Sequence, residues 1–491
     1  METSNATRLL RWRDLYREAE LYKAAVRVYT KPLFLWRKAL STSTDGKTLY
    51  DLAAHGLKGL HAIHQQLQSE RFHFRPSVGL KYNFNGKRRT LYIPPWEERI
   101  VDLLLYRLVT QRFHAWFSPC SYAYRDHSYG LDHCQSRIAA VLRSAKLPLY
   151  VVKRDISDYF ASVNHEILLQ QIAEHVDPKD FLFELVRQRV RFDYEDETGS
   201  HRASVGIPFG CASACVFSNI YLTELDRQIQ SIPGIHYFRY ADDMLLLSND
   251  HAAIVQASGK LARSLELLQL TAKPSHAADL VLTDQGSACD IRFSRASAFR
   301  HLGLQFEITG QVSLSRDKRR KIQNLFRFAF RRSRRRWTKI IDPRERARAL
   351  AAVASQTLER GVRNVAIVDY YLKHVTDIAQ LKSIDHWLAE EVLSLVFGGH
   401  RKGLFAKISF NDLRNFGLPS LVHRHRLFRH HKIDSPFFIW QQQKAGRAFK
   451  GTVASRKRAA SAAPDFSLCP EAAAPEKPVR EGGRLYMGVM E

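Results

Sequence analysis

Two adjacent carboxylates interrupt an apolar stretch in the segment RYADDMLLLS, residues 239–248. Side chains of a strand alternate between its two faces, so we expect Asp242 and Asp243 at a tight turn between two strands. Buried carboxylates repel each other and lose solvation, and they need a cation or strong hydrogen bonds in compensation. A solvated hairpin turn is the alternative interpretation, because aspartate is common in turns.

A third carboxylate ends another apolar stretch, in LYVVKRDISDYFASVNH, residues 149–165. Asp155 closes the expected strand, and Asp158 and Phe160 precede what looks like the start of a helix. If the two strands are neighbours, Asp155 joins Asp242 and Asp243. Carboxylates of this kind hold two hard divalent cations for in-line phosphoryl transfer, in which one ion activates a hydroxyl and the other holds a triphosphate.

The surrounding sequence predicts mixed α and β structure that could position these carboxylates. Strand-like runs alternate with helical stretches over residues 148–306, which is typical of α/β or α+β proteins. Alternation around Asn85-Gly86 predicts a β-hairpin. The remaining patterns predict helices at 8–40, 51–70 and 97–118, a basic helical region at 311–440 and a disordered tail. We expect the histidines at 423, 425, 430 and 431 of the basic region to lie on the surface.

Composition narrows the class of partner. The chain has 491 residues, enough for several domains, and a formal net charge of +26. Such an excess attracts a polyanion, either nucleic acid or an anionic membrane surface. The six cysteines form no CxxC pair, which favours a reducing, cytoplasmic compartment. The sequence contains no run of about 18 apolar residues, so we expect no membrane span. Nucleic acid is therefore the leading partner.

Several segments together resemble reverse transcriptases. Tyr240-Ala241-Asp242-Asp243 resembles their YADD box, and DISDYF, residues 155–160, resembles the aspartate box that precedes it by 87 residues. Further resembling blocks follow in the family's order across residues 80–306: GKRRTLYIPPWEERIVDLLLYRLV (86–109), FSPCSYAYRDHSYGLDHC (117–134), GIPFGCASACVFSNIYLTELD (206–226), LELLQLTAKPSH (265–276) and HLGLQF (301–306).

The resemblance implies an α+β right-hand polymerase with fingers, palm and thumb, a helical C-terminal region and a disordered tail. The boundaries that we expect are an N-terminal helical extension at 1–75, fingers at 76–147, a palm at 148–306 with a fingers insertion at about 166–205, a basic helical thumb and C-terminal region at 307–440, and a flexible tail at 441–491.

The resemblance also implies catalytic roles. The metal ligands are Asp155, Ile156, Asp242 and Asp243, which would hold two Mg²⁺ ions, with Mn²⁺ as the alternative. Lys273 resembles the lysine that protonates the pyrophosphate leaving group as a general acid, and a surface lysine is the alternative.

Other matching positions imply contacts with the incoming nucleotide. Lys87 and Arg89 would grip the triphosphate, with Arg88 as the competing candidate and a solvated basic hairpin as the bland alternative. Asp158 would offer its backbone N–H to the triphosphate. Phe160 would face the sugar and exclude a 2′-hydroxyl, unless it is an ordinary core aromatic.

The chain departs from the family at two places. Phe209, before Gly210, stands where the family has a glutamine that contacts nucleotide and template, and Ala214-Cys215 replaces Ser-Pro. The resemblance therefore does not say how the pocket at Phe209 and Gly210 selects the nucleotide or handles the template. Tyr240 is expected at the minor groove of the primer terminus, with a strand core position as the alternative.

Residues 316–348 contain 15 Lys and Arg against three acidic residues, with apolar side chains threaded through them. A thumb helix with one face on the protein and the other on a phosphate backbone has this pattern. A solvated basic face is the alternative interpretation.

Among reverse transcriptases, the chain resembles the bacterial abortive-infection and unknown-group enzymes of antiphage defence, which are related to group II intron and retron enzymes. This implies cDNA synthesis from dNTPs on a dedicated noncoding RNA template, in the cytoplasm and away from membranes. A retron-like or intron-derived enzyme and a catalytically dead RNA-binding scaffold are the alternatives, and homo-oligomerisation is left open.

Overall fold

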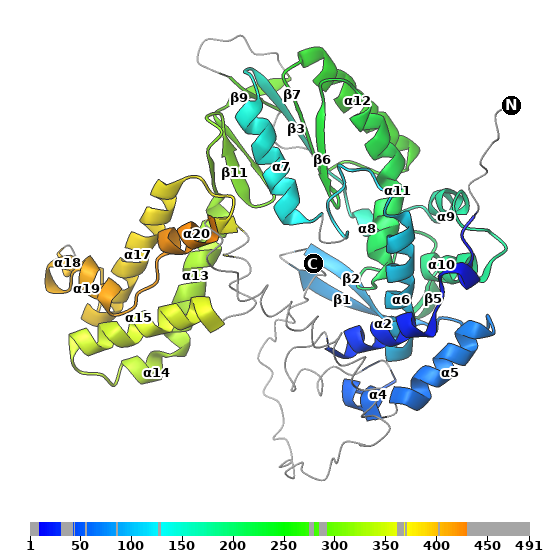
Figure 1. The fold of residues 1–491 in the computed structure, drawn as a ribbon, viewed down its shortest axis with the longest axis horizontal. Helices are drawn as coiled ribbons and strands as arrows, with labels where there is room; N and C mark the ends of the chain where they lie inside the picture. The colour runs from blue at the N-terminus through cyan, green and yellow to red at the C-terminus, as the bar shows by residue number, and fades with distance from the viewer. Residues whose placement is uncertain are drawn as a thin grey trace. The chain divides into compact units, whose positions relative to one another are not determined.

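The computed structural model describes residues 9–30, 43, 45–54, 56–84, 87–125, 129–273, 279–283, 292–360, 368, 371–400 and 403–429. The chain divides into two compact units, Met1–Ala296 (unit 1) and Ser297–Glu491 (unit 2), which are described here one at a time (Figure 1).

Unit 1 begins with helices, as expected for the N-terminal extension, but they are shorter and more numerous than expected. The region expected as one helix at 8–40 contains α1 (Trp12–Leu15) and α2 (Glu18–Thr30), because the backbone is extended at Tyr16 between them. The indole of Trp12 donates to the carbonyl of Leu67 at 3.0 Å, and its backbone N–H donates to the Asp180 carboxylate at 2.6 Å. These bonds fix α1 against two segments that are distant in sequence.

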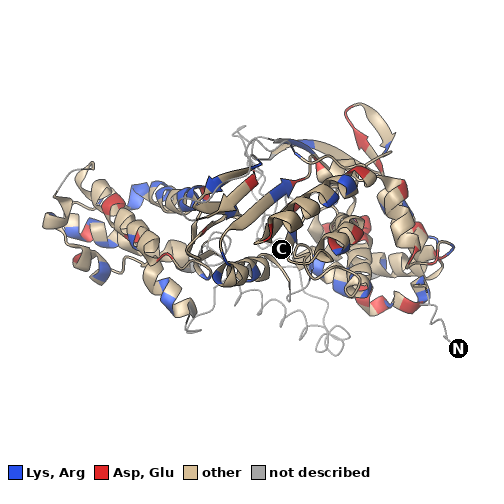
Figure 2. Ribbon diagram, turned by 90° about the horizontal axis from the view of Figure 1, so that it is seen from above, with Lys and Arg blue, Asp and Glu red and all other residues tan. Residues whose placement is uncertain are grey.

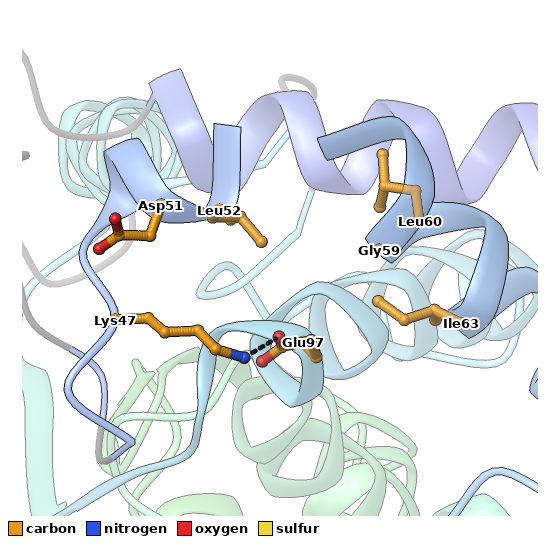
Figure 3. Close-up of a pocket in the computed structure, with 7 residues that line it drawn as sticks. All are labelled: Lys47, Asp51, Leu52, Gly59, Leu60, Ile63 and Glu97. Atoms are coloured by element: carbon orange, nitrogen blue, oxygen red, sulfur yellow. Dashed lines mark hydrogen bonds and ion pairs between the residues drawn. The ribbon is translucent and has the colours of Figure 1, made fainter. Parts of the chain in front are cut away.

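Three further helices form this side of unit 1: α4 (Leu49–Ala54), α5 (Gly56–Gln68) and α6 (Trp96–Phe113). A small cavity of about 160 Å³ lies where they meet (Figure 3). Its wall contains the apolar side chains of Leu52, Leu60 and Ile63, and an ion pair of 3.2 Å joins Lys47 and Glu97 at its edge. None of the predicted site residues lines it.

The predicted hairpin forms the edge of a four-stranded sheet with the order β2-β1-β4-β5. Strand β1 (Ser77–Phe84) pairs antiparallel with β2 (Lys87–Ile93), in a register that runs from Val78 opposite Ile93 to Phe84 opposite Lys87. The predicted turn at 85–86 lies outside the described residues. Strand β1 also pairs in parallel with β4 (Asp193–Asp196), which forms a second hairpin with β5 (Gly199–Arg202).

A five-stranded sheet holds the predicted carboxylates. Its order is β6-β7-β3-β8-β9, with β3 (Leu149–Asp155) in the middle between β7 (Asp243–Ser248) and β8 (Asp279–Leu282). The outer strands are β6 (His236–Tyr240) and β9 (Phe293–Ala296), and only the pair β8–β9 is parallel. The apolar runs around Asp155 and Asp242 are thus neighbouring strands.

Six further helices lie in the described part of unit 1: α7 (Leu131–Ser144), α8 (Tyr159–Ser162), α9 (His165–Ala173), α10 (Phe181–Val190), α11 (Ser213–Gln230) and α12 (His251–Leu267). Helix α11 is the most deeply buried of these, and it packs on α6, α9, α12 and β6. Its buried side chains join the sheet and the N-terminal helices in one continuous apolar core. The sheet therefore rests on a rigid support, which is what a precise catalytic geometry needs.

Unit 2 consists of a small antiparallel sheet and a group of helices. The sheet has the order β10 (Ala298–His301), β11 (Leu304–Glu307) and β12 (Val312–Leu314). The helices are α13 (Arg316–Arg332), α14 (Arg334–Trp337), α15 (Pro343–Arg360), α17 (Ile378–Phe397), α18 (Leu404–Lys407), α19 (Phe410–Asn415) and α20 (Leu421–Arg429).

Helix α13 has the two faces that the sequence predicts. Ile322, Phe326 and Phe330 are buried at a spacing of four residues, while most of its arginines and lysines are exposed. One expectation for unit 2 is wrong: His425 is not on the surface but buried, with Nε2 at 2.8 Å from the carbonyl oxygen of Val375. His425 lies on the face of its helix that points to the core, although its neighbours in sequence are basic.

The α+β fold class is confirmed. The domain boundaries stay predictions, and the predicted tail at 441–491 lies outside the described residues, as do the histidines at 430 and 431. No helix in the described ranges combines the length and apolar character needed to cross a lipid bilayer.

Candidate active site

The three predicted carboxylates meet at one end of the five-stranded sheet. Asp155, the last residue of β3, lies directly opposite Asp243, the first residue of β7. Tyr240 pairs with Asp243 across the β6–β7 hairpin, so Ala241 and Asp242 form the turn between these strands. The tight turn predicted from the adjacent aspartates is therefore present, and it brings Asp242 beside the Asp155–Asp243 pair.

The turn is held in a strained conformation by a buried arginine. Ala241 has φ of 57°, in the left-handed region that residues with a Cβ seldom adopt. Its carbonyl accepts a hydrogen bond of 3.1 Å from Arg239, whose guanidinium forms a two-bond ion pair with Asp226 at 2.6 and 2.7 Å. Arg239 and Asp226 are both fully buried. This support was missed by sequence reasoning, although an arginine in an apolar strand three residues before the aspartates was its visible signal.

Burial and the repulsion of neighbouring carboxylates raise the pKa of Asp242 and of Asp243. Burial is the main cause that raises the pKa of Asp243, to about 6, and the charges of Asp155 and Asp242 add to the effect while Lys153 and Lys273 oppose it. The pKa of Asp242 is also raised, first by burial and then by the negative charge of Asp155. A bound cation would stabilise such a site, because it neutralises the repulsion between the carboxylates.

Lys273 supplies positive charge to the site from another segment. Its ammonium group forms an ion pair with Oδ2 of Asp155, and its backbone N–H donates to the Asp155 carbonyl at 2.7 Å. The neighbouring N–H of Ser157 donates to Thr271 at 2.8 Å, so residues 271–273 run beside the end of β3. The lysine predicted as a general acid is thus placed among the carboxylates rather than at a remote surface.

The donor set suits a divalent cation. Carboxylate oxygens are the ligands that Mg²⁺ and Mn²⁺ prefer, and Oδ1 of Asp155 is buried without a hydrogen-bond partner among the described residues. Within the described ranges, no three Asp, Glu, His or Cys side chains already converge as a finished metal site. The hydrocarbon side chain of Ile156 has no donor atom and is fully buried, so its backbone carbonyl is the group that could serve as a ligand.

Phe160 and Phe209, two of the residues predicted to contact the nucleotide, belong to one aromatic cluster. The ring of Phe160 meets Phe209 edge-on at 5.6 Å between centroids and Tyr124 at 6.4 Å. The guanidinium of Arg89 lies 5.4 Å from the centre of the Phe209 ring, within cation–π range. Arg89, Phe160 and Phe209, which the sequence treats as separate motifs, therefore form one group. Tyr124 was not among the predicted residues.

The Phe209 loop is fixed on both sides. The N–H of Tyr92 in β2 donates to the Phe209 carbonyl at 2.9 Å, and the N–H of Ile207 donates to the Phe160 carbonyl at 2.7 Å. Gly210 has φ of 112°, and a Cβ there would lie 2.4 Å from Leu91 and 3.0 Å from the Tyr92 carbonyl oxygen. Glycine is therefore required where the loop meets β2.

A second buried ion pair, between Asp102 of α6 and Arg189 of α10, holds the junction of this loop with α11, and sequence reasoning did not find it. Asp102 accepts hydrogen bonds from Arg189 at 3.1 Å and from the N–H of Ala212 at 2.5 Å. Arg189 also donates to Sγ of Cys211 at 2.6 Å. A carboxylate at this helix start satisfies N–H groups that have no partner within the helix.

The remaining predicted residues have simpler positions. Lys87 begins β2, and its side chain lies outside the described residues. Arg88 and Arg89 project to opposite faces of β2, and Arg89 is the one whose guanidinium lies over the Phe209 ring. Asp158 is exposed with a left-handed backbone, φ of 41°, and the helix that follows includes Phe160. Tyr240 is half-buried at the end of β6.

Comparisons with known proteins relate the region that contains these carboxylates to one family. Residues 79–306 match the family model described as "Reverse transcriptase (RNA-dependent DNA polymerase)". Protein YkfC of Escherichia coli strain K12 is 25% identical over 229 residues, which cover 37% of this chain and 58% of YkfC. An uncharacterized 91 kDa protein in the cob intron of Schizosaccharomyces pombe is 24% identical over 225 residues, which cover 45% of this chain and 27% of that protein.

A solved structure of apo telomerase from Candida tropicalis, truncated from its C-terminal domain, has a TM-score of 0.39 and 13% identity and covers 56% of this chain and 63% of that one. Telomerase from Candida albicans in complex with a TWJ fragment of telomeric RNA has a TM-score of 0.41 and 11% identity over 70% of this chain and 67% of that one. The curated relatives are matched over little more than half of their length or less. Residues 79–306 of this chain form a reverse transcriptase domain, the domain of RNA-directed DNA polymerases.

Proposed function

We propose that the whole chain is an RNA-directed DNA polymerase that extends a 3′-hydroxyl with dNMP units copied from an RNA template. The observation that carries this proposal is the placement of Asp155 opposite Asp243 with Asp242 in the adjoining turn. Each addition forms a bond between the 3′-oxygen and the α-phosphorus and breaks the α–β phosphoanhydride bond, with pyrophosphate as the leaving group.

We assign the metal site to the carboxylates of Asp155, Asp242 and Asp243, with the carbonyl of Ile156 as a further oxygen ligand. When bound there, two Mg²⁺ ions supply charge neutralisation for the triphosphate and lower the pKa of the attacking hydroxyl. Lys273 lies where it can return a proton to the leaving pyrophosphate, since its ammonium group already reaches the Asp155 carboxylate.

Selection of the nucleotide falls to the aromatic cluster in this proposal. The Phe160 ring is held between Tyr124 and Phe209 and would leave no room for a 2′-hydroxyl. Arg89 would bind the triphosphate through its guanidinium while the Phe209 ring orients it. Phe209 thus takes the place of the family's glutamine as a positioning group rather than as a hydrogen-bonding group.

For the physiological role, we propose cDNA synthesis on a dedicated noncoding RNA in antiphage defence, in the cytoplasm. The basic α13 of unit 2 supports the RNA-binding part of this role. An intron-derived enzyme is the second candidate, because two curated relatives are named after introns. Sequencing of the RNA and DNA that co-purify with the protein separates the two, since an intron transcript would identify the second candidate.

The polymerase proposal is tested by incorporation of labelled dNTP on a primed RNA template with Mg²⁺. We expect Asp155→Asn, Asp242→Asn and Asp243→Asn each to abolish incorporation. The matched control is Asp193→Asn, because Asp193 is an exposed carboxylate on β4, in a different sheet. No incorporation by the wild-type protein on any primed RNA would instead support an RNA-binding scaffold without catalysis.

A further inference from the structure

One aromatic residue of α13 does not join the apolar core of unit 2. Phe328 is 66% exposed, whereas Ile322, Phe326 and Phe330 of the same helix are at most 1% exposed. A single exposed apolar side chain is ordinary on a protein surface. What makes Phe328 informative is the composition of the helix surface around it.

Exposed cations surround Phe328 at helical spacing. Arg331 and Arg332 follow it by three and four residues, and Lys321 precedes it by two turns on the same face. All three cations are exposed. Figure 2 colours the Lys and Arg positions blue along the ribbon of the described residues. We name Lys321, Phe328, Arg331 and Arg332 the α13 stripe, which extends over about 16 Å of helix.

Two other cations of α13, Arg327 and Lys318, have partners within unit 2. Arg327 forms an ion pair of 3.1 Å with Glu391 and lies 5.2 Å from the centre of the Trp387 ring. Lys318 lies 4.6 Å from the centre of the Tyr371 ring. In contrast, no acidic side chain in the described part of unit 2 forms an ion pair with Lys321, Arg331 or Arg332. The charge of the stripe is therefore available to an external anion.

We propose that the α13 stripe binds single-stranded nucleic acid, with Phe328 stacked on an unpaired base and Lys321, Arg331 and Arg332 on the flanking phosphates. An exposed ring between cations offers the two interactions that bind single strands without reading their sequence, namely base stacking and phosphate neutralisation. A duplex keeps its bases stacked on one another, so the ring gains little from it. This site shares no residue with the carboxylate site, and its binding does not depend on the proposed polymerase activity.

The test measures binding of the full-length protein in EDTA, which removes catalysis from the readout. The probes are a fluorescent 12-nucleotide unstructured RNA, the DNA strand of the same sequence, and a blunt 12-base-pair RNA duplex, each followed by anisotropy over a range of salt concentrations. Phe328→Ala is expected to weaken binding of the single strands by about fivefold to a hundredfold and to leave duplex binding nearly unchanged. Phe328→Trp should retain the wild-type affinity.

Two further variants separate stacking from charge. Replacement of Lys321, Arg331 and Arg332 by Gln should flatten the slope of log affinity against log salt by about 2, whereas Phe328→Ala should leave the slope unchanged. Ile341→Ala is the matched control, because Ile341 is 90% exposed but lies outside α13 and should not affect binding. The ratio of RNA to DNA affinity identifies which strand the stripe takes.

The proposal is overturned if Phe328→Ala binds single strands as tightly as wild type or weakens duplex binding to the same extent. It is also overturned if Phe328→Ala lowers the melting temperature substantially, because the ring would then be structural, or if it changes only self-association, because the stripe would then be a protein interface. If the wild-type protein shows no polymerase activity but its single-strand binding depends on Phe328, the proposed function is contradicted and the binding proposal stands.

Discussion

Lys273 and Asp155 are linked twice, by an ion pair between their side chains and by a backbone hydrogen bond of 2.7 Å from the lysine N–H to the aspartate carbonyl. The backbone bond fixes the position of the lysine, and the ion pair places its ammonium group on a carboxylate oxygen that a metal ion also needs. Lys273 therefore has two consequences for catalysis that oppose each other, since it competes with the cation and is the candidate proton donor.

Replacement of Lys273 by Ala separates these two effects. Without the ammonium group, the Mg²⁺ concentration for half-maximal activity should fall several-fold, because Asp155 no longer has a competing cation. The rate at saturating Mg²⁺ should fall by about a hundredfold or more, because the leaving group loses its general acid. Steady-state incorporation at varied Mg²⁺ measures both. Lys273→Arg keeps the positive charge and should leave the Mg²⁺ dependence near wild type; an unchanged saturating rate in both variants would exclude the proton-donor role.

Removal of the Phe160 ring should admit ribonucleotides. In Phe160→Ala, the space beside Tyr124 and Phe209 becomes open, and the preference for dNTP over rNTP in kcat/KM should fall by about tenfold to a hundredfold. Parallel incorporation assays with one dNTP and the matching rNTP give the ratio. If the preference stays as in wild type, Phe160 is a core aromatic and not the selecting group.

The family's glutamine, introduced as Phe209→Gln, tests the cation–π contact with Arg89. The contact is worth about 0.5–1 kcal/mol at a half-exposed site, so KM for dNTP should rise about twofold to fivefold with a smaller effect on kcat. Phe209→Tyr keeps the ring and serves as the control. A Phe209→Gln enzyme with the same or lower KM would show that Arg89 does not depend on the ring.

The buried pair of Arg239 and Asp226 should be a large contributor to stability beneath the active-site turn. Arg239→Met leaves the Asp226 carboxylate buried and without its guanidinium partner, which typically costs about 3–5 kcal/mol of unfolding free energy. Chemical denaturation measures the loss. The double variant Arg239→Met with Asp226→Leu removes both charges and should recover much of the stability, but not the activity, because the Ala241 carbonyl still loses its hydrogen bond.

Stability should depend on pH through Asp243. Burial raises the pKa of Asp243 to about 6, above its ordinary value of 3.8, so the folded protein binds this proton more tightly than the unfolded chain. The ionised carboxylate therefore lowers the free energy of unfolding, fully above pH 6 and progressively less as the pH falls toward 4. In Mg²⁺-free buffer, Asp243→Asn should raise the melting temperature at pH 7.5, and this gain should shrink near pH 4.5. A gain of equal size at both pH values would assign it to something other than the charge.

Local sequence patterns were sufficient to predict much of the fold and the site. Short apolar runs predict the strands that contain Asp155 and Asp243, because the burial pattern of a strand is visible within a few consecutive residues. The adjacent aspartates predict the turn, and the periodicity of Ile322, Phe326 and Phe330 predicts the amphipathic α13. Such features are encoded within one element and need no knowledge of its partners.

The tertiary structure decided what lies next to what. Only the register of β3 with β7 brings Asp155 opposite Asp243, and only the approach of residues 271–273 to β3 pairs Lys273 with Asp155. The cluster of Arg89, Phe160 and Phe209 depends on backbone hydrogen bonds between segments more than 40 residues apart in sequence. His425 is buried and Phe328 is exposed against the local pattern, because burial is set by the packing of several helices together. Sequence by itself thus determined the chemical groups and their elements, while long-range packing determined their partners.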